Sequence, residues 1–107
     1  MPGPPDELKV TNITNTSCTL AWNAPQIDGG SLITGYYVEM YNESDWIRIK
    51  EVPATAECRI DIDGLLEDAE NVFRVSAVNN VGVGPPSVST LSVSTFGKLK
   101  PGFHYPS

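Results

Sequence analysis

Apolar and polar residues alternate along most of this chain with a period of two, and not with the 3.6-residue period of a helix. In one such run Cys18, Leu20 and Trp22 occupy a single face. Alternation of this kind predicts β-strands with one buried side. The runs that carry it clearly are residues 17–23, 34–41, 58–63 and 71–79, and shorter or noisier runs lie at residues 8–13, 46–52 and 88–95.

Residues that favour turns separate these runs. Gly29 and Gly30 supply the positive φ angles that a chain reversal needs, and Pro85-Pro86 indicates an edge strand because proline donates no ladder hydrogen bond. Residues 65–70 resemble one helical turn, but the segment is short, and we predict a crossover loop there. Short strands with this punctuation predict an all-β, seven-stranded antiparallel β-sandwich.

The spacing between cysteine and tryptophan distinguishes two kinds of sandwich. An immunoglobulin domain carries a cysteine, a tryptophan on the following strand, and a distant second cysteine that pairs with the first. In this chain Trp22 follows Cys18 so closely that both lie on one strand. The sequence therefore does not fit the immunoglobulin pattern.

Five motifs, in the same order along the chain, resemble a fibronectin type III domain over residues 4–95. They are Leu20-Ala21-Trp22 with Pro25, residues 28–39, Gly64-Leu65, residues 73–79 and residues 82–87. The resemblance implies an immunoglobulin-like sandwich at residues 1–96, with a proline-rich lead-in at 1–5 and a linker or tail at 97–107. Its expected structural core consists of Leu20, Trp22, Tyr36, Val38, Leu65, Phe73 and Val75.

Finer features resemble the modules of giant muscle proteins such as titin, twitchin, myomesin and myosin-binding protein C. These features are Pro2-Gly3-Pro4-Pro5, Asp28-Gly29-Gly30-Ser31 followed by Gly35-Tyr36-Tyr37-Val38-Glu39, Trp46, and Asn79-x-x-Gly82-x-Gly84. The resemblance implies a cytoplasmic, sarcomere-type location and a non-catalytic role as a spacer and docking unit in a multidomain chain. Its implied partners are neighbouring immunoglobulin or fibronectin modules and thick-filament proteins.

An extracellular adhesion or receptor module is the alternative, because such proteins carry the same fold. The chain contains three N-glycosylation sequons, which is more than its residue frequencies predict by chance, and they favour this alternative. The sequons are Asn12-Ile13-Thr14, Asn15-Thr16-Ser17 and Asn42-Glu43-Ser44.

Composition narrows the classes of function. The net charge of −6 disfavours binding to nucleic acid. No apolar run approaches the roughly 20 residues that span a bilayer, so we expect no membrane insertion. The first residues carry neither the basic nor the apolar segment of a signal peptide.

No group of residues predicts an enzyme, a cofactor or a metal site. The single histidine, His104, lies in the tail, so neither a Ser-His-Asp nor a Cys-His arrangement has a positioned base. Asp61 and Asp63 share the solvent face of one strand. The segment Gly82-Val83-Gly84 lacks the lysine and the helix of a phosphate-binding loop.

Cys18 and Cys58 project inward from the second and fifth strands, which are neighbours in the implied fold. In that arrangement they could lie close enough to form a disulfide. We expect both to be reduced, because a buried cysteine of an intracellular module serves as a small apolar side chain.

The outward faces of the third and sixth strands predict a partner surface. Tyr37, Tyr41, Val72 and Val78 lie there, with Arg74 between them. Tyrosine and arginine are favoured residues in protein interfaces. The alternative is ordinary cross-strand packing, in which Arg74 lies over the ring of Tyr37.

At one position the chain departs from the family it resembles. Fibronectin modules usually carry a tyrosine six residues after the leucine of Gly-Leu, and its hydroxyl bonds back to the preceding backbone. Here that position is Asn71. Asparagine forgoes the burial of an aromatic ring, so we expect Asn71→Tyr to stabilise the domain.

Overall fold

The computed structural model describes residues 2–42, 44–55, 57–90 and 93–95. Strands account for the regular secondary structure of these residues, and none of them lies in a helix. The strands are β1 (Asp6–Thr11), β2 (Cys18–Asn23), β3 (Gly35–Asn42), β4 (Asp45–Pro53), β5 (Arg59–Ile62), β6 (Glu70–Asn71), β7 (Phe73–Val78), β8 (Val83–Pro86) and β9 (Val93–Ser94). The short strands β6 and β9 have two residues each.

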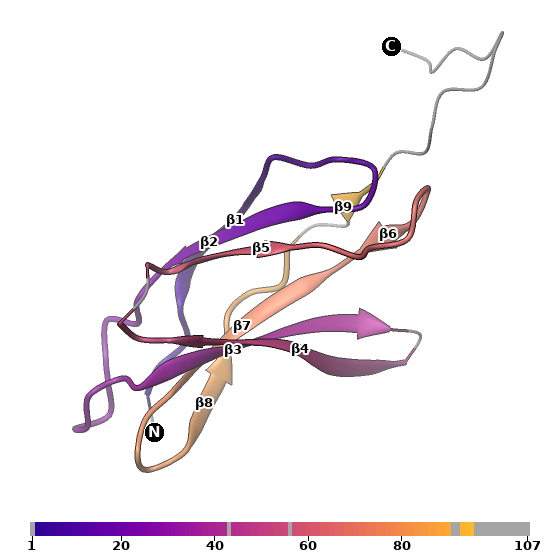
Figure 1. Ribbon diagram of the computed structural model, residues 1–107. Helices are drawn as coiled ribbons and strands as arrows, with labels where there is room; N and C mark the ends of the chain where they lie inside the picture. The colour runs from indigo at the N-terminus through magenta and orange to yellow at the C-terminus, as the bar shows by residue number, and fades with distance from the viewer. Residues whose placement is uncertain (1, 43, 56, 91–92, 96–107) are drawn as a thin grey trace, which may run out of the picture.

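Two antiparallel sheets pack face to face (Figure 1). One sheet has the order β1-β2-β5 and the other the order β4-β3-β7-β8, while β6 and β9 form a separate pair. Three hairpins join neighbours within a sheet: β1 with β2, β3 with β4, and β7 with β8. The predicted all-β antiparallel sandwich is confirmed.

The core between the sheets consists of inward residues of the alternating runs. It contains the seven residues expected from the sequence, together with Cys18, Val52, Ile62 and Ala77. Trp22 of one sheet packs edge to face on Tyr36 of the other, with ring centroids 5.3 Å apart. Burial, and then the hydrogen bond from the Cys58 thiol, raises the pKa of the Tyr36 hydroxyl.

The last strand of the larger sheet begins earlier than the sequence predicts. The alternation places it at residues 88–95, but the strand that pairs with β7 is β8, Val83–Pro86. Pro85 and Pro86 fit this position because β8 is an edge strand with a partner on one side only. The two prolines thus mark an edge strand as predicted, but that strand lies before residues 88–95 and not within them.

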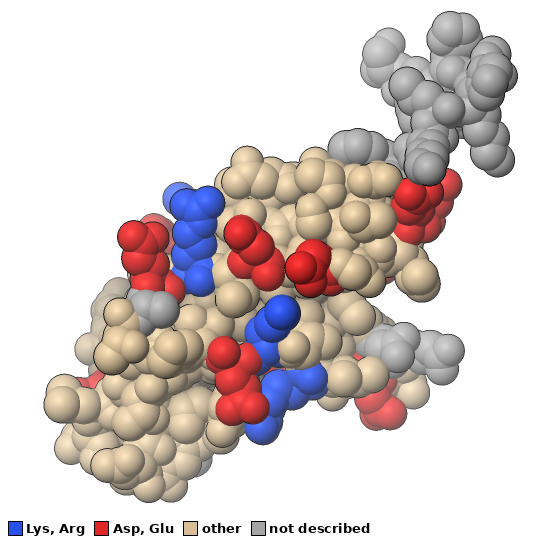
Figure 2. All heavy atoms as spheres, in the orientation of Figure 1, with Lys and Arg blue, Asp and Glu red and all other residues tan. Residues whose placement is uncertain are grey.

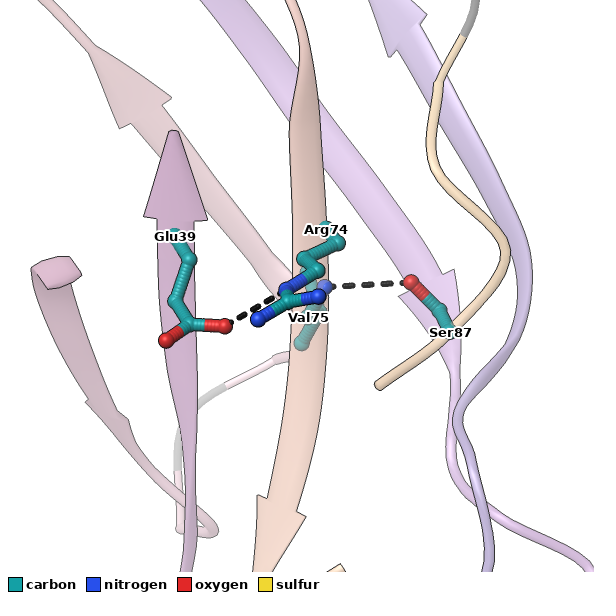
Figure 3. Close-up of polar contacts among 4 residues, drawn as sticks. All are labelled: Glu39, Arg74, Val75 and Ser87. Carbon is teal, nitrogen blue, oxygen red and sulfur yellow. Dashed lines mark hydrogen bonds and ion pairs between the residues drawn. The ribbon is translucent and has the colours of Figure 1, made fainter. Parts of the chain in front are cut away.

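Beyond β8 the chain continues alongside β7, but side-chain hydroxyls replace part of the backbone ladder. The amide of Val75 donates to Oγ of Ser87 at 3.0 Å (Figure 3). The amide of Phe73 donates in the same way to Oγ1 of Thr90, also at 3.0 Å. Since hydroxyl acceptors do not follow a two-residue period, hydrophobic alternation does not reveal this pairing.

The connection from β5 to β6 is a loop, as predicted for residues 65–70. It leads into Asn71, which is buried and whose side-chain amide donates to the carbonyl of Ala69 at 3.4 Å. The side chain at this position thus bonds back to the preceding loop, as the resemblance implies for a tyrosine.

We expect Asn71→Tyr to raise the free energy of unfolding by about 1 kcal/mol, because the ring buries more apolar surface than the amide does. Urea unfolding of both proteins measures the difference. Asn71→Phe, which lacks the hydroxyl, is the matched control and should gain less. An unchanged or lower urea midpoint for Asn71→Tyr would show that the loop leaves no room for the ring.

Cys18 lies in β2 and Cys58 directly precedes the neighbouring strand β5, but the two residues are not opposite each other. Cys18 pairs with Ile62, whereas the carbonyl of Cys58 accepts a hydrogen bond from the amide of Trp22 at 3.0 Å. The positions of Cys18 and Trp22 are separated by about 13 Å of extended strand. A disulfide needs Cα atoms within about 7 Å, so the strand register excludes the bridge that the sequence leaves open.

We expect both cysteines to accept a thiol label when the protein is denatured without reductant. In the folded protein Cys18 should react slowly at neutral pH, because burial raises the pKa of its thiol and shields it from the reagent. Intact mass after labelling measures both results. A denatured species that carries no label would contradict the register.

Candidate functional site

All five residues of the predicted partner surface have outward-facing positions. Tyr37 and Tyr41 alternate in β3 with side chains of the core, and Val72, Arg74 and Val78 alternate with core residues in and beside β7. Because β3 and β7 pair along their length, these positions share the outer face of the larger sheet. They divide into two groups, one toward each end of β3.

The first group is built around Arg74. Its Nε lies 2.7 Å from Oε1 of Glu39 on β3 (Figure 3). Its guanidinium carbon lies 4.2 Å from the ring centroid of Trp46, and that ring packs edge to face on Tyr41 at 5.3 Å. The amide of Tyr41 also donates to the carbonyl of Val72 at 2.9 Å. Arg74 is thus held from two sides, while Tyr41 keeps 44% of its surface exposed.

The second group is centred on Tyr37. The guanidinium of Arg48, on β4, lies over the Tyr37 ring at 3.6 Å from its centroid. The alternative of ordinary cross-strand packing is therefore wrong in one detail, because Arg48 and not Arg74 lies over the Tyr37 ring. The register explains the difference, because Arg74 pairs with Glu39 and the residue opposite Tyr37 is Ser76.

A hollow of about 300 Å³ opens beside Tyr37. A volume at the low end of small-molecule sites suits a single side chain of a partner. A Cβ at Gly35 would approach the carbonyl oxygen of Val52 to 2.8 Å, so glycine permits the close contact of β3 and β4 here. The hollow is lined by Thr34, Gly35, Tyr36, Tyr37, Glu51, Val52, Pro53 and Val78.

The sequence does not assign Trp46 and Arg48 to the partner surface, although both complete it. Their run alternates poorly because the pairing of β3 with β4 shifts register between Val38 and Glu39, where β4 carries an extra residue. The triplet Trp46-Ile47-Arg48 keeps a two-residue period by itself. If this triplet is aligned with β3 separately from the rest of the run, Trp46 lies opposite Tyr41 and Arg48 lies opposite Glu39, both on the outward face.

We expect a double-mutant cycle on Arg74→Ala and Trp46→Leu to give a coupling energy of about 0.5–1 kcal/mol, the usual range for a partly exposed cation–π contact. Urea unfolding of the four proteins supplies the values. The matched control is the cycle of Arg74→Ala with Tyr37→Leu, whose coupling should be close to zero. A larger coupling to Tyr37 than to Trp46 would contradict the observed stacking.

The remaining candidate groups have structural partners or lie outside the described residues. Oδ1 of Asp61 accepts a hydrogen bond from Oγ1 of Thr19 at 2.8 Å. His104 and the tail at residues 97–107 are not among the described residues. Within the described ranges no three His, Cys, Asp or Glu side chains are grouped to hold a metal ion, and no helix is long and apolar enough to cross a membrane.

Charge is mixed on the side of the molecule in Figure 2, where acidic and basic side chains are interspersed. The outer face of the larger sheet adds aromatic rings and paired charged groups to this pattern. Aromatic and arginine side chains are enriched in protein–protein interfaces. The geometry therefore suits contact with another protein.

Comparison with known families identifies the family of this sandwich. The fibronectin type III domain model matches residues 3–93. The chain belongs to the fibronectin type III family. Fibronectin type III domains are generally non-catalytic modules of multidomain proteins.

Relatives of this fibronectin type III domain include muscle proteins and a receptor. Titin from Drosophila melanogaster is 40% identical over 97 residues, which are 88% of this chain and, to the nearest per cent, 0% of titin. Receptor-type tyrosine-protein phosphatase F from Danio rerio is 41% identical over 88 residues, 81% of this chain and 4% of the phosphatase. The solved structure of titin domains A168-A170 has a TM-score of 0.83 at 32% identity, covering 91% of this chain and 33% of that one.

The predicted resemblance to modules of giant muscle proteins is confirmed. This fibronectin type III domain spans only a small part of the curated relatives named above, so it corresponds to one module of such chains. Both titin and a receptor-type phosphatase thus contain a module similar to this one.

Proposed function

We propose that this chain is a non-catalytic spacer and docking module of a larger cytoplasmic filament protein of the muscle type. The observation that carries the proposal is the 40% identity with titin over 88% of the chain. The module comprises residues 1–96, and residues 97–107 link it to its neighbour. Its partners are adjoining immunoglobulin or fibronectin modules and thick-filament proteins, and it uses no cofactor.

Docking takes place on the outer face of the larger sheet. Tyr41 is the exposed aromatic residue of one group, and the hollow beside Tyr37 and Val78 accepts one side chain of the partner at the other. Arg74 supports this group, since its ion pair with Glu39 and its position over the Trp46 ring hold the aromatic pair in place. A rigid aromatic residue at the centre of a contact supplies much of its binding energy.

Cosedimentation with filaments of purified striated-muscle myosin tests the proposal. We expect the chain to sediment with the filaments and Tyr41→Ser to weaken binding about fivefold or more, as for an interface residue worth at least about 1 kcal/mol. Lys9→Ser, at an exposed position of β1 in the other sheet, is the matched control and should bind normally. Absence of the unchanged protein from the pellet, or equal losses in both variants, would contradict the proposal.

An extracellular adhesion or receptor module is the second candidate. Its support is the identity with the receptor-type phosphatase and the presence of the sequons. Asn12 is exposed, with a long hydrogen bond of 3.5 Å from its Nδ2 to Oγ1 of Thr19, and Nδ2 of Asn15 donates to Oε1 of Glu67 on the surface at 2.8 Å. Both side chains are thus within reach of a glycosylating enzyme if the chain enters the secretory pathway.

A further inference from the structure

The proline-rich start of the chain is packed into the domain. Pro2 is among the fully buried side chains, and the amide of Gly3 donates to the carbonyl of Ile27 at 2.8 Å. Gly84 of β8 lies against Pro2 so closely that a Cβ at this glycine would overlap the Pro2 carbonyl oxygen. The first residues of the chain therefore have a fixed position on the sandwich, beside the β2–β3 loop and β8.

One buried side chain fixes the two loops at this end of the molecule. Nδ2 of Asn79 donates to the carbonyl oxygens of Asp28 at 2.7 Å and of Ser31 at 3.4 Å. Its Oδ1 accepts from the amides of Val81 at 2.9 Å and of Gly82 at 3.1 Å. The loop between β2 and β3 and the turn between β7 and β8 are thus bound together at the end where the N-terminus lies (Figure 1).

These fixed loops expose apolar side chains. Ile27, Leu32 and Val81 have 69%, 82% and 64% of their surface exposed. The amide of Val81 bonds to Asn79 directly. Ile27 and Leu32 are the sequence neighbours of Asp28 and Ser31, whose carbonyl oxygens accept from Asn79. We call these three side chains, together with the buried Pro2, the N-terminal pole. Large apolar side chains exposed on two loops that are bonded together indicate a surface that another protein domain covers.

We infer that the N-terminal pole seats the folded module that precedes this one in the same polypeptide, so that the two modules form one rigid unit. This inference rests on the proposed function, because it requires a multidomain chain. Pro2 is held at the pole, so any chain that precedes it emerges beside Ile27, Leu32 and Val81.

The small area of the pole favours a tethered occupant. A stable interface between separate molecules buries about 1,000 Å² or more, which three side chains do not supply. A neighbour joined through a short, fixed connection is present at an effective concentration in the millimolar range, so a weak contact suffices. A second copy of this chain or an unattached protein is therefore a poorer fit.

The test uses a two-module fragment of the parent polypeptide that contains this chain and the folded unit before it. Backbone amide residual dipolar couplings report whether both modules share one alignment tensor. We expect a shared tensor in the unchanged fragment and its loss in the variant Ile27→Ser, Leu32→Ser, Val81→Ser. The matched control, with Ile13→Ser, Leu66→Ser and Val88→Ser, removes three apolar side chains exposed elsewhere and should keep the shared tensor. Urea unfolding of both variants checks that each still folds.

The outcomes separate this inference from the proposed function. If a folded unit precedes this chain but aligns independently in the unchanged fragment, the inference is wrong and the function stands. If the parent polypeptide has no folded unit there, the inference is wrong, while the function stands as long as another module follows this one. If this chain alone self-associates and the pole variant abolishes the association, the occupant is a second copy, and the inference is overturned.

Discussion

Phe73→Ala should lower the free energy of unfolding by about 3–5 kcal/mol, the usual cost of truncating a buried phenylalanine. Phe73 has no exposed surface and lies in β7, between β3 and β8 in the larger sheet. Its loss removes apolar burial and leaves a cavity between the sheets. Since a domain of this size has about 5–15 kcal/mol of stability in total, the variant should be close to unfolding at room temperature.

Urea unfolding followed by tryptophan fluorescence measures the change in Phe73→Ala, because Trp22 lies in the same core. The matched control is Leu66→Ala, whose side chain is largely exposed, and which should change stability by no more than about 0.5 kcal/mol. Equal effects of the two substitutions would show that Phe73 does not have the central position in the core described above.

Asn79→Ala should lower the free energy of unfolding by about 2 kcal/mol. The residue is buried, and its side chain makes four hydrogen bonds to backbone groups of two loops. Each hydrogen bond is worth about 1 kcal/mol net, and part of the loss is recovered where water reaches the freed groups. Amide hydrogen exchange at Val81 should accelerate more than exchange in the core strands, because this amide loses its acceptor. Exchange at Gly82 should change less, because its amide also donates to the backbone carbonyl of Asn79, which the substitution keeps.

Asn80→Ala is the matched control for Asn79→Ala, since Asn80 adjoins it in sequence but is exposed. Its stability and its amide exchange should stay close to those of the unchanged protein. If Asn80→Ala destabilised the domain as strongly as Asn79→Ala, the two loops would depend on the turn as a whole and not on the buried amide.

The sequence predicts the core well, because burial between two sheets imposes a two-residue period that the residues themselves display. Leu20, Val38, Phe73 and Val75 follow it without interruption, and all are completely buried. The same logic places Tyr37 and Arg74 on the outward face. Wherever the backbone ladder is regular, periodicity alone assigns a residue to its side.

Prediction fails where the ladder is irregular. An extra residue in β4 disrupts the alternation near Arg48, and hydroxyl acceptors replace backbone pairing at Ser87 and Thr90. Arg74 stacks on Trp46 and not on Tyr37 because its neighbours depend on the register between strands, which one sequence does not specify.

The contacts at the N-terminal pole are even harder to predict from the sequence. Asn79 reaches carbonyl oxygens about fifty positions earlier in the chain, and the contact of Gly84 with Pro2 joins the two ends of the described fold. Both contacts depend on the loop conformations of a completed sandwich. The motif Asn79-x-x-Gly82 marks the turn but does not disclose the residues that the asparagine binds.

The proposed function places this module in a cytoplasmic filament of muscle. Immunofluorescence with an antibody against this chain, on intact and on permeabilised striated-muscle fibres, tests it most directly. We expect regular cross-striations in permeabilised fibres and no staining of intact ones. Staining of the surface of intact fibres would contradict the claim and establish the extracellular alternative.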